Sequence, residues 1–345
     1  MSLAQTMADA AERLDLPDPL LRLGIRALVG RTRNRLDRAS HRGVHAAAAF
    51  ADGMAAYPIA LHTDDANRQH YELPPEFFAL VLGPRRKYSC CLYPTGRESL
   101  EEAEEHALEE TVAHAGLADG QDILELGCGW GSLSLFMAAR FPAARIIAVS
   151  NAAAQREHIE SSARALGLAN LRVVTADMND FTPDGRYDRV VSVEMFEHMA
   201  NWHGLLARIR DWLKADGRLF LHVFAHAGSP YRFNHADPAD WIARHFFTGG
   251  IMPSHDLASC FPDLFTLERD WRWSGVHYAH TARGWLENYD RHAGTIQQLL
   301  VEIYGADAAL WARRWRLFFL ATEGLFGHAG GRPWGVSHHL LAPAP

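Results

Sequence analysis

Apolar and polar positions along this chain follow two different periods. Between residues 122 and 226, short apolar runs of strand length alternate with longer segments that carry apolar residues at helical spacing. Strands are expected at 122–127, 144–150, 171–178, 187–195 and 218–226, and helices at 131–141, 152–168 and 202–217. Because strands that alternate with helices at this spacing form βαβ units, the pattern predicts an α/β fold: a parallel sheet with helices on both faces.

The segments on either side have other patterns. A helical extension is expected over residues 1–61, followed by one large domain over 62–345 that begins with an acidic helix at 100–117. Residues 227–262 combine proline, glycine and aromatic residues, so we expect a lid-like insertion over a pocket rather than a linker. A strand at 265–273, helices across 281–326 and a last strand at 334–342 follow.

Arginines alternate with apolar residues in the N-terminal extension. The apolar positions at helical spacing are Leu21, Ile25 and Leu28, and the arginines between and after them are Arg22, Arg26, Arg33 and Arg35. This stripe is typical of a helix that packs its leucines on the core, which is the interpretation we favour. The alternative is peripheral contact between this Arg-rich helix and an anionic membrane.

Composition and charge exclude several classes of protein. The 48% hydrophobic and 22% charged residues are ordinary for a soluble globular protein. The formal net charge of −7 argues against nucleic-acid binding by bulk electrostatics. No apolar run approaches the roughly 18 residues needed to span a bilayer, and no signal-peptide pattern begins the chain.

The cysteines and histidines give no metal or disulfide pattern. The four cysteines are an adjacent pair and two scattered residues, which fits neither a disulfide framework nor a zinc site and favours a reducing, cytoplasmic setting. The twenty histidines include the pairs His277/His280 and His338/His339, neither of which makes a convincing metal site. The sequence leaves open whether the protein forms a homodimer.

A glycine stands at every second position in part of the stretch ILELGCGWGS, residues 123–132. Gly127, Gly129 and Gly131 lie between a predicted strand and a predicted helix, where open parallel sheets bind ligands. The spacing differs from the GxGxxG of dinucleotide sites, and Glu125 would repel a pyrophosphate. An acid at this place suits a ligand with an ammonium group and a ribose, which indicates S-adenosylmethionine.

A second group of chemically active residues follows the fourth predicted strand. The segment VEMFEHM places Glu194, Glu197 and His198 at the edge of the expected cleft. Two carboxylates and an imidazole can bind a substrate ammonium and remove its proton, which an amine must lose to become a nucleophile. Methyl transfer from a sulfonium otherwise needs alignment and exclusion of water. We therefore predict that these three residues are catalytic.

Longer motifs resemble one known family. The segments YSCCLYPTGRESLEEAEEHAL, LELGCGWGSLSLFMAARFP, VSNAAAQREHIE and VVSVEMFEHM resemble, in this order, the cyclopropane-fatty-acid synthase superfamily of methyltransferases. The resemblance covers residues 62–342, and ARHFFTGGIMPSHDL and HYAHTARGWLENYD are most similar to the coclaurine N-methyltransferase branch. It implies the class I methyltransferase fold, a Rossmann-like sheet of seven strands, with S-adenosylmethionine as cofactor.

The resemblance also implies cofactor contacts. They are Tyr88 and Ser89 near the methionine carboxylate, Gly127 and Gly129 against the ligand, Ser150, Asn151 and Gln155 near the ribose, and Ala176 and Asp177 near the adenine. Class I methyltransferases often have an acidic residue where this chain has Ser150, so the ribose must be held differently here. Asp177 also suits a simple turn, because it ends a strand.

Two classes of methyl acceptor remain open. In the N-methyltransferase branch, residues matching Glu194, Glu197 and His198 are linked to amine binding and catalysis. In the lipid synthases, a bicarbonate base is held by residues that match Cys90, Glu197, His222 and Tyr278. Glu194 favours a cationic substrate, because the lipid synthases commonly have a small residue there. Phe247 is one of several aromatic residues that could wall a pocket for an aromatic amine.

We therefore expect a methyltransferase that N-methylates a small cyclic or aromatic amine. The first alternative is a cyclopropane synthase or C-methyltransferase that acts on unsaturated phospholipid acyl chains, with bicarbonate as a possible cofactor. The second is a non-catalytic protein that binds S-adenosylmethionine, which the intact group of acids and imidazole argues against.

Overall fold

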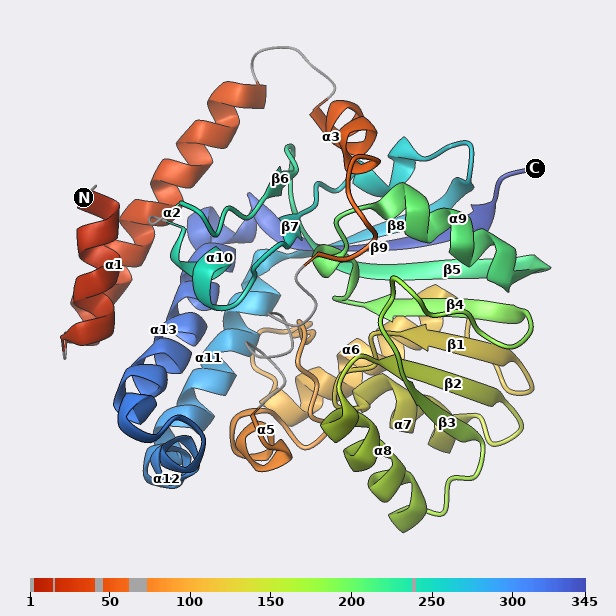
Figure 1. Cartoon of the computed structure of the whole chain (residues 1–345), viewed down its shortest axis with the longest axis horizontal. Coiled ribbons are helices and arrows are strands. Elements are labelled where there is room, and N and C mark those ends of the chain that lie inside the picture. Colours follow the sequence, from red (N-terminus) through yellow and green to blue (C-terminus); the bar gives the residue numbers. More distant parts are fainter. Residues whose placement is uncertain (1–2, 15, 41–45, 62–72, 238–239) are drawn as a thin grey trace.

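Seven strands form one central sheet in the computed structural model, which describes residues 3–14, 16–40, 46–61, 73–237 and 240–345 (Figure 1). The strand order is β3-β2-β1-β4-β5-β9-β8. The strands are β1 (Asp122–Leu126), β2 (Arg145–Ser150), β3 (Leu171–Thr175), β4 (Tyr187–Val193), β5 (Leu213–His226), β8 (Phe265–Ser274) and β9 (Trp334–Pro343). Every strand predicted from the sequence is present, and the seven-stranded fold is confirmed.

Helices flank the sheet and form a separate layer at one end. Their bounds are α1 (Leu3–Arg13), α2 (Asp18–Ser40), α3 (Ala46–Met54), α5 (Pro75–Val81), α6 (Leu100–Ala115), α7 (Ser132–Arg140), α8 (Ala153–Ala165), α9 (Trp202–Trp212), α10 (Trp241–His245), α11 (Gly275–Arg291), α12 (Ala293–Tyr304) and α13 (Ala308–Phe326). Short 3₁₀ helices are η1 (Phe196–His198), η2 (Leu257–Cys260), η3 (Gly305–Asp307) and η4 (His328–Gly331).

Local signals set several of these ends. α6 begins with a capping box between Ser99 and Glu102 and ends at Gly116 in the left-handed conformation. α9 is shorter than the predicted 202–217, because Leu213 is buried and already pairs with Tyr187 as part of β5. Sheet pairing therefore ends this helix before its helical pattern does.

The strands are buried on both faces. Leu124 and Val190 pack with residues of α9, whereas Ile123 and Val191 pack with residues of α6 and α7. Neighbouring strand positions point to opposite faces, so burial of both faces requires continuous apolar runs rather than alternation. This is the pattern that predicted the sheet.

One strand departs from the predicted parallel arrangement. Strands β1 to β5 pair in parallel as expected, but β9 lies between β5 and β8 and runs antiparallel to both. α11 leaves the end of β8 and α13 packs along α11, so the chain returns to the edge that it left. Ser274 at the end of β8 consequently pairs with Gly335 at the start of β9, and β9 must run backwards.

The N-terminal extension packs on the helical layer. Leu21 and Ile25 of α2 contact the apolar core cluster to which α13 belongs, and Arg22 forms an ion pair of 2.6 Å with Glu323 of α13. The favoured interpretation of the Leu stripe, a packed helix, is confirmed for these two residues. Contact with a membrane surface stays a prediction. Within the described ranges, no helix is both long and apolar enough to cross a bilayer.

The insertion at 227–262 contains β6 (Tyr231–Arg232), α10, β7 (Ile251–Met252) and η2. β6 and β7 pair as a small antiparallel sheet beside the main one. Thr248 of this insertion lines the cavity described below, and the Phe247 ring stacks on His198 with centroids 5.1 Å apart. The predicted boundary at residue 62 falls at 62–72, outside the described residues.

Candidate active site

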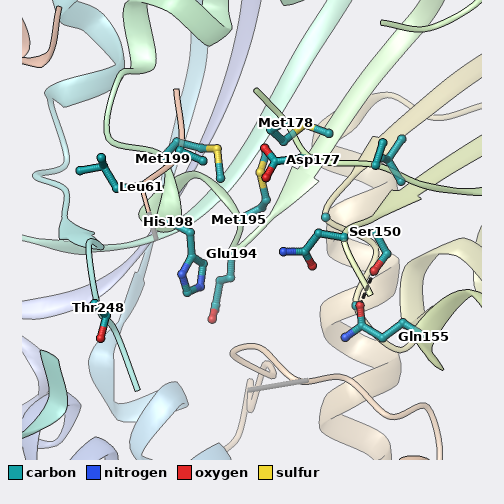
Figure 2. A pocket seen from close by; sticks show the side chains of 16 residues that line it. Leu61, Ser150, Gln155, Asp177, Met178, Glu194, Met195, His198, Met199 and Thr248 are labelled. Atoms are coloured by element: carbon teal, nitrogen blue, oxygen red, sulfur yellow. Dashed lines mark hydrogen bonds between the residues drawn. The ribbon is translucent and has the colours of Figure 1, made fainter. Parts of the chain in front are cut away.

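A cavity lies where β1, β2, β3 and β4 end, the place expected for a ligand in an open α/β sheet (Figure 2). Many of the residues predicted from the sequence line it: Gly127, Gly129, Ser150, Asn151, Gln155, Asp177, Glu194 and His198. The structure thus brings most of the cofactor candidates and two of the three catalytic candidates to one site.

The three glycines after β1 have different tasks, although all have positive φ values. A Cβ on Gly127 would lie 2.5 Å from the Met195 side chain, and a Cβ on Gly131 would lie 2.5 Å from Ile159. A Cβ on Gly129 would meet nothing within 4 Å. Gly127 and Gly131 are therefore required for packing as well as for the turn, and Gly129 is the glycine that leaves room for a ligand.

A buried pair of polar residues ends β2. The Ser150 hydroxyl accepts a hydrogen bond from the Ala152 N–H at 3.0 Å and lies 2.5 Å from Gln155 Oε1. Gln155 Nε2 is left buried without a hydrogen-bond partner among the described residues. A buried donor without a partner is uncommon in folded proteins and points to a missing acceptor. A ribose hydroxyl of S-adenosylmethionine would supply that acceptor. Gln155 would then hold the ribose in place of the acidic side chain that class I methyltransferases often use.

Asp177 accepts a backbone hydrogen bond and also lines the cavity. Its Oδ1 accepts a hydrogen bond of 2.7 Å from the Asn179 N–H, which is the turn role that the sequence suggested. The same residue lines the cavity. The turn therefore fixes the carboxylate at the wall where the adenine was expected.

Four of the predicted cofactor residues lie outside the lining of this cavity: Tyr88, Ser89, Glu125 and Gly131. The Glu125 carboxyl, only 2% exposed, accepts a hydrogen bond from the Ser134 hydroxyl, and burial raises its pKa to about 7. Glu125 thus ties α7 to β1 and is not a fully ionised partner for a cation. Ser89 accepts a hydrogen bond from the Lys87 ammonium.

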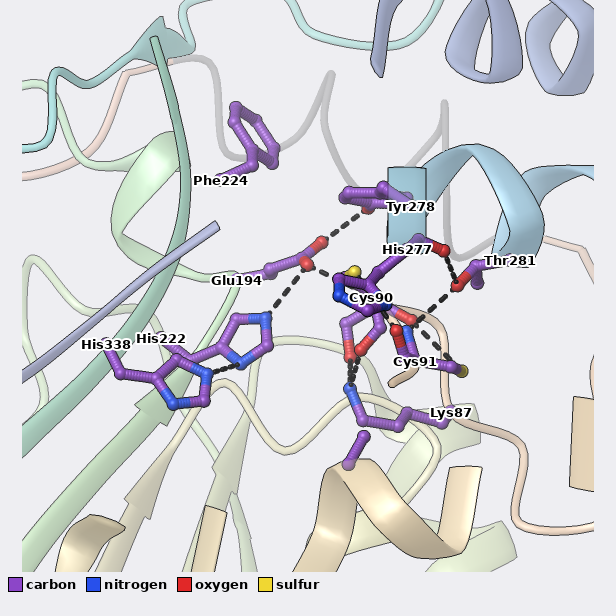
Figure 3. A network of polar contacts seen from close by, with 12 residues as sticks. Lys87, Cys90, Cys91, Glu194, His222, Phe224, His277, Tyr278, Thr281 and His338 are labelled. Atoms are coloured by element: carbon purple, nitrogen blue, oxygen red, sulfur yellow. Dashed lines mark hydrogen bonds and ion pairs between the residues drawn. The ribbon is translucent and has the colours of Figure 1, made fainter. Parts of the chain in front are cut away.

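Glu194 occupies an unusual backbone conformation at the cavity wall. Its φ is +49°, a left-handed value that costs a non-glycine residue about 1–3 kcal/mol. Its side chain is held by three groups: Oε1 lies 2.9 Å from the Cys90 N–H and 3.2 Å from His222 Nε2, and Oε2 accepts a bond of 2.6 Å from the Tyr278 hydroxyl (Figure 3). Burial raises the pKa of Glu194, and the charge of Lys87 partly offsets that rise.

The other two catalytic candidates differ in their exposure to the cavity. His198 lines it beside Glu194, and burial lowers the pKa of its imidazole to about 4, so the ring is neutral at pH 7. Glu197 is fully buried and does not line the cavity; Oε1 accepts a hydrogen bond of 2.6 Å from the Phe224 N–H. Burial, and then the charge of Glu194, raises the pKa of Glu197 well above the usual value.

The pocket candidates Cys90, His222 and Tyr278 converge on Glu194 rather than on open space. Cys90 contributes its backbone N–H; its thiol is buried, which raises the thiol pKa well above the usual value and keeps it neutral. Phe247, the fourth candidate, supports His198 from the insertion by stacking. These groups position Glu194 and His198 at the cavity wall.

Several residues of the site escaped the sequence analysis. Ala60 and Leu61, from the predicted N-terminal extension, line the cavity, and the Ala60 N–H donates to Asn179 Oδ1. Met178, Met195 and Met199 line it as well. None of these residue types carries a chemical signal, so only the fold could place them. Within the described ranges, no group of three His, Cys, Asp or Glu residues is arranged to hold a metal ion.

Comparison with known proteins assigns the chain to a family. The family model described as mycolic acid cyclopropane synthetase matches residues 61–329. The chain belongs to this family. Its relatives are methyltransferases that depend on S-adenosylmethionine, and the cavity, with its open glycine and unpaired Gln155 donor, fits that cofactor.

Both branches suggested by the sequence are among the relatives. The chain is 34% identical to (S)-coclaurine N-methyltransferase of Thalictrum flavum subsp. glaucum, over 82% of this chain and 80% of that one. It is 31% identical to the cyclopropane-fatty-acyl-phospholipid synthase of Escherichia coli K12, over 64% of this chain and 56% of that one. A solved coclaurine N-methyltransferase, bound to N-methylheliamine and S-adenosylhomocysteine, superposes with a TM-score of 0.92 at 29% identity, covering 99% of this chain and 100% of that one.

The predicted family, the fold and S-adenosylmethionine as cofactor are thereby confirmed, whereas bicarbonate is not shown. The non-catalytic alternative loses its basis, since the relatives are enzymes. All four cysteines are free. The cytoplasmic setting, homodimer formation and the individual site roles stay predictions.

Proposed function

We propose that the protein transfers the methyl group of S-adenosylmethionine to the nitrogen of a small cyclic or aromatic amine. The observation that carries this proposal is the carboxylate of Glu194, held at the cavity wall by Cys90, His222 and Tyr278. A carboxylate fixed in a largely buried site attracts a cation much more strongly than it would in water. An alkylammonium is the cation that a methyl-transfer site could use.

The neighbouring groups suit an amine nucleophile. When bound, S-adenosylmethionine supplies an electrophilic methyl group on a sulfonium. Glu194, with its raised pKa, can accept a proton from a substrate ammonium, and the neutral ring of His198 can accept a hydrogen bond from the same nitrogen. Met178, Met195 and Met199 give the cavity wall apolar surface that suits a ring-bearing amine, and Phe247 holds His198 in place by stacking on it.

The same carboxylate argues against the lipid alternative. In the resemblance to the lipid synthases, Cys90, His222 and Tyr278 are three of the groups assigned to a bicarbonate base, and here all three contact Glu194 instead. A carboxylate and bicarbonate are both planar oxyanions with similar acceptor geometry. We infer that this chain carries its own base at that position and does not need bicarbonate.

A panel of acceptors tests the proposal. Formation of S-adenosylhomocysteine is measured with cyclic and aromatic amines, and separately with vesicles of unsaturated phospholipid. We expect turnover with secondary or primary cyclic amines, and mass spectrometry should show one added methyl group on nitrogen. Turnover with vesicles alone would establish the lipid alternative, for which the similarity to the Escherichia coli synthase is the supporting observation.

A further inference from the structure

A continuous chain of hydrogen-bonding side chains runs from Glu194 through the sheet to the surface. His222 Nε2 lies 3.2 Å from Glu194 Oε1, and His222 Nδ1 lies 2.8 Å from His338 Nε2 (Figure 3). His338 Nδ1 lies 2.8 Å from His114 Nδ1, and His114 Nε2 lies 3.0 Å from Glu110 Oε1. Each of these imidazoles uses both of its nitrogens.

The fold brings these histidines together from distant parts of the sequence. His222 of β5 and His338 of β9 are direct cross-strand partners, and His114 approaches from α6 on one face of the sheet. His222 and His338 are 0% exposed, whereas the side chains of His114 and Glu110 are 10% and 41% exposed. One end of this hydrogen-bonded path therefore lies at the cavity wall and the other end is in water, and the two histidines nearest the cavity are fully buried.

We propose that this chain of His222, His338 and His114 conducts the proton released in catalysis from Glu194 to Glu110 and so to solvent. The inference rests on the proposed N-methylation, because methylation of an ammonium substrate must release one proton. In the reaction a N–H bond of the amine breaks and its proton goes to Glu194; the N–C bond forms, and the C–S electron pair stays with sulfur. No oxidant or reductant is needed.

The relay step itself is balanced by tautomer exchange. Protonated Glu194 donates to His222 Nε2, while the Nδ1 proton of His222 passes to His338 Nε2. The Nδ1 proton of His338 passes to His114 Nδ1, and the Nε2 proton of His114 passes to Glu110, which releases it to water. Each ring gains one proton and loses one, so the tautomers reverse and the rings must reorient before the next turnover.

The surroundings keep the imidazoles neutral, which such exchange requires. Burial lowers the pKa values of His222 and His338 well below the usual value, and it lowers that of His114 as well. Aromatic rings enclose the path: Trp273 contacts both His222 and His338, and Trp271 stacks on His114 with centroids 3.8 Å apart. Water is thereby excluded from the middle of the chain.

Charged and titratable groups face this path of hydrogen-bonded histidines at three places. Around Glu194 they are Lys87, Cys90, Glu197, His198 and Tyr278; beside His338 there is His339; and beside His114 there is Glu110. Lys87 repels a cation on His222 or His338, and Glu110 attracts one at His114. The field of these groups therefore favours movement of a proton outward.

Kinetics of three variants test the relay with the amine acceptor found in the panel. His338→Phe breaks the chain at its centre, and His114→Ala breaks it at the accessible end. His339→Phe is the matched control: His339 is the next residue, 2% exposed, and its ring nitrogens have no hydrogen-bond partner among the described residues. Affinity for S-adenosylhomocysteine, measured by calorimetry, verifies that each variant is folded.

We expect kcat to fall on the order of 10- to 100-fold in His338→Phe and His114→Ala, less than the roughly 10²–10⁴-fold effect of losing a direct acid–base group because Glu194 is still present, with a changed solvent deuterium isotope effect. Imidazole in the buffer should restore His114→Ala, whose missing ring borders solvent, but not His338→Phe. His339→Phe should retain wild-type kcat. Amine methylation by His338→Phe with the kcat and isotope effect of the wild type would refute the relay.

A second measurement does not depend on turnover. In protein with ¹⁵N-labelled histidine, protonation of Glu194 should switch the tautomers of His222, His338 and His114 together, and leave that of His339 unchanged. Independent titration of the three rings would overturn the relay. If no amine is methylated but the three rings switch together, the proposed function fails while the proton path is supported.

Discussion

Replacement of Glu194 by glycine should convert this enzyme into one that depends on an added anion. The substitution removes a side chain whose backbone has φ +49°, a value that glycine adopts freely, so the local fold should survive. It leaves a space bordered by the Cys90 N–H, the Tyr278 hydroxyl and His222. Formate or bicarbonate has the shape and the charge to occupy that space.

The expected affinity follows from the three contacts. Hydrogen bonds to a charged group contribute about 1.5–3 kcal/mol each, so three contribute about 5–9 kcal/mol. Loss of the anion's translational and rotational freedom costs about 4 kcal/mol or more. The remaining ~1–5 kcal/mol corresponds to a Kd between roughly 200 mM and 0.2 mM. Such an anion can be titrated in an ordinary assay.

The assay follows formation of S-adenosylhomocysteine from an amine in CO₂-free buffer at constant ionic strength. Without anion, kcat/KM of Glu194→Gly should be about 10²–10⁴-fold below wild type, the range of general-base effects. Formate should restore part of that loss, while chloride should not. His198→Ala is the control, since the three hydrogen bonds that hold Glu194 come from Cys90, His222 and Tyr278 and not from His198. If Glu194→Gly binds S-adenosylhomocysteine normally but no oxyanion restores it, the carboxylate is not acting as the base.

Three further outcomes are expected. His198→Ala should abolish turnover, because it removes the imidazole at the cavity wall, while calorimetry shows S-adenosylhomocysteine bound nearly as in wild type; equal loss of both would make this residue structural. Gly129→Ala should weaken S-adenosylhomocysteine binding with a small loss of stability. Gly131→Ala, whose Cβ would meet Ile159, should lower Tm more. Equal Tm values for the two variants would contradict the assignment of Gly129 to the ligand and Gly131 to packing. His339 has a pKa of about 4 when folded and about 6.5 when unfolded, so it stabilises the fold above pH 6.5 and loses that contribution as the pH falls toward 4. Relative to His339→Phe, the unfolding free energy of wild type in urea should therefore fall by about 1.4 kcal/mol per pH unit between pH 6.5 and 4, and parallel curves would refute this pKa.

The sequence by itself determined the strands, the glycine turn and the family, because each rests on local information. Apolar runs such as 144–150 carry the sheet's burial on both faces, and the order of glycines at 127, 129 and 131 can be read without knowledge of any distant residue. For the same reason the place of Glu194 and His198 at the cavity wall was predictable: their position after a strand sufficed.

Only the tertiary structure decided which residues meet. The reversal of β9 depends on how α11 and α13 pack, and that reversal is what sets His338 beside His222. Glu125 and Glu194 are both acids at the ends of strands. Glu125 is buried beneath α7 and accepts a hydrogen bond from Ser134, whereas a left-handed backbone conformation places Glu194 at the cavity wall. Contacts, burial and the resulting proton affinities arise between segments far apart in the chain, and they therefore leave no pattern in the sequence of either segment alone.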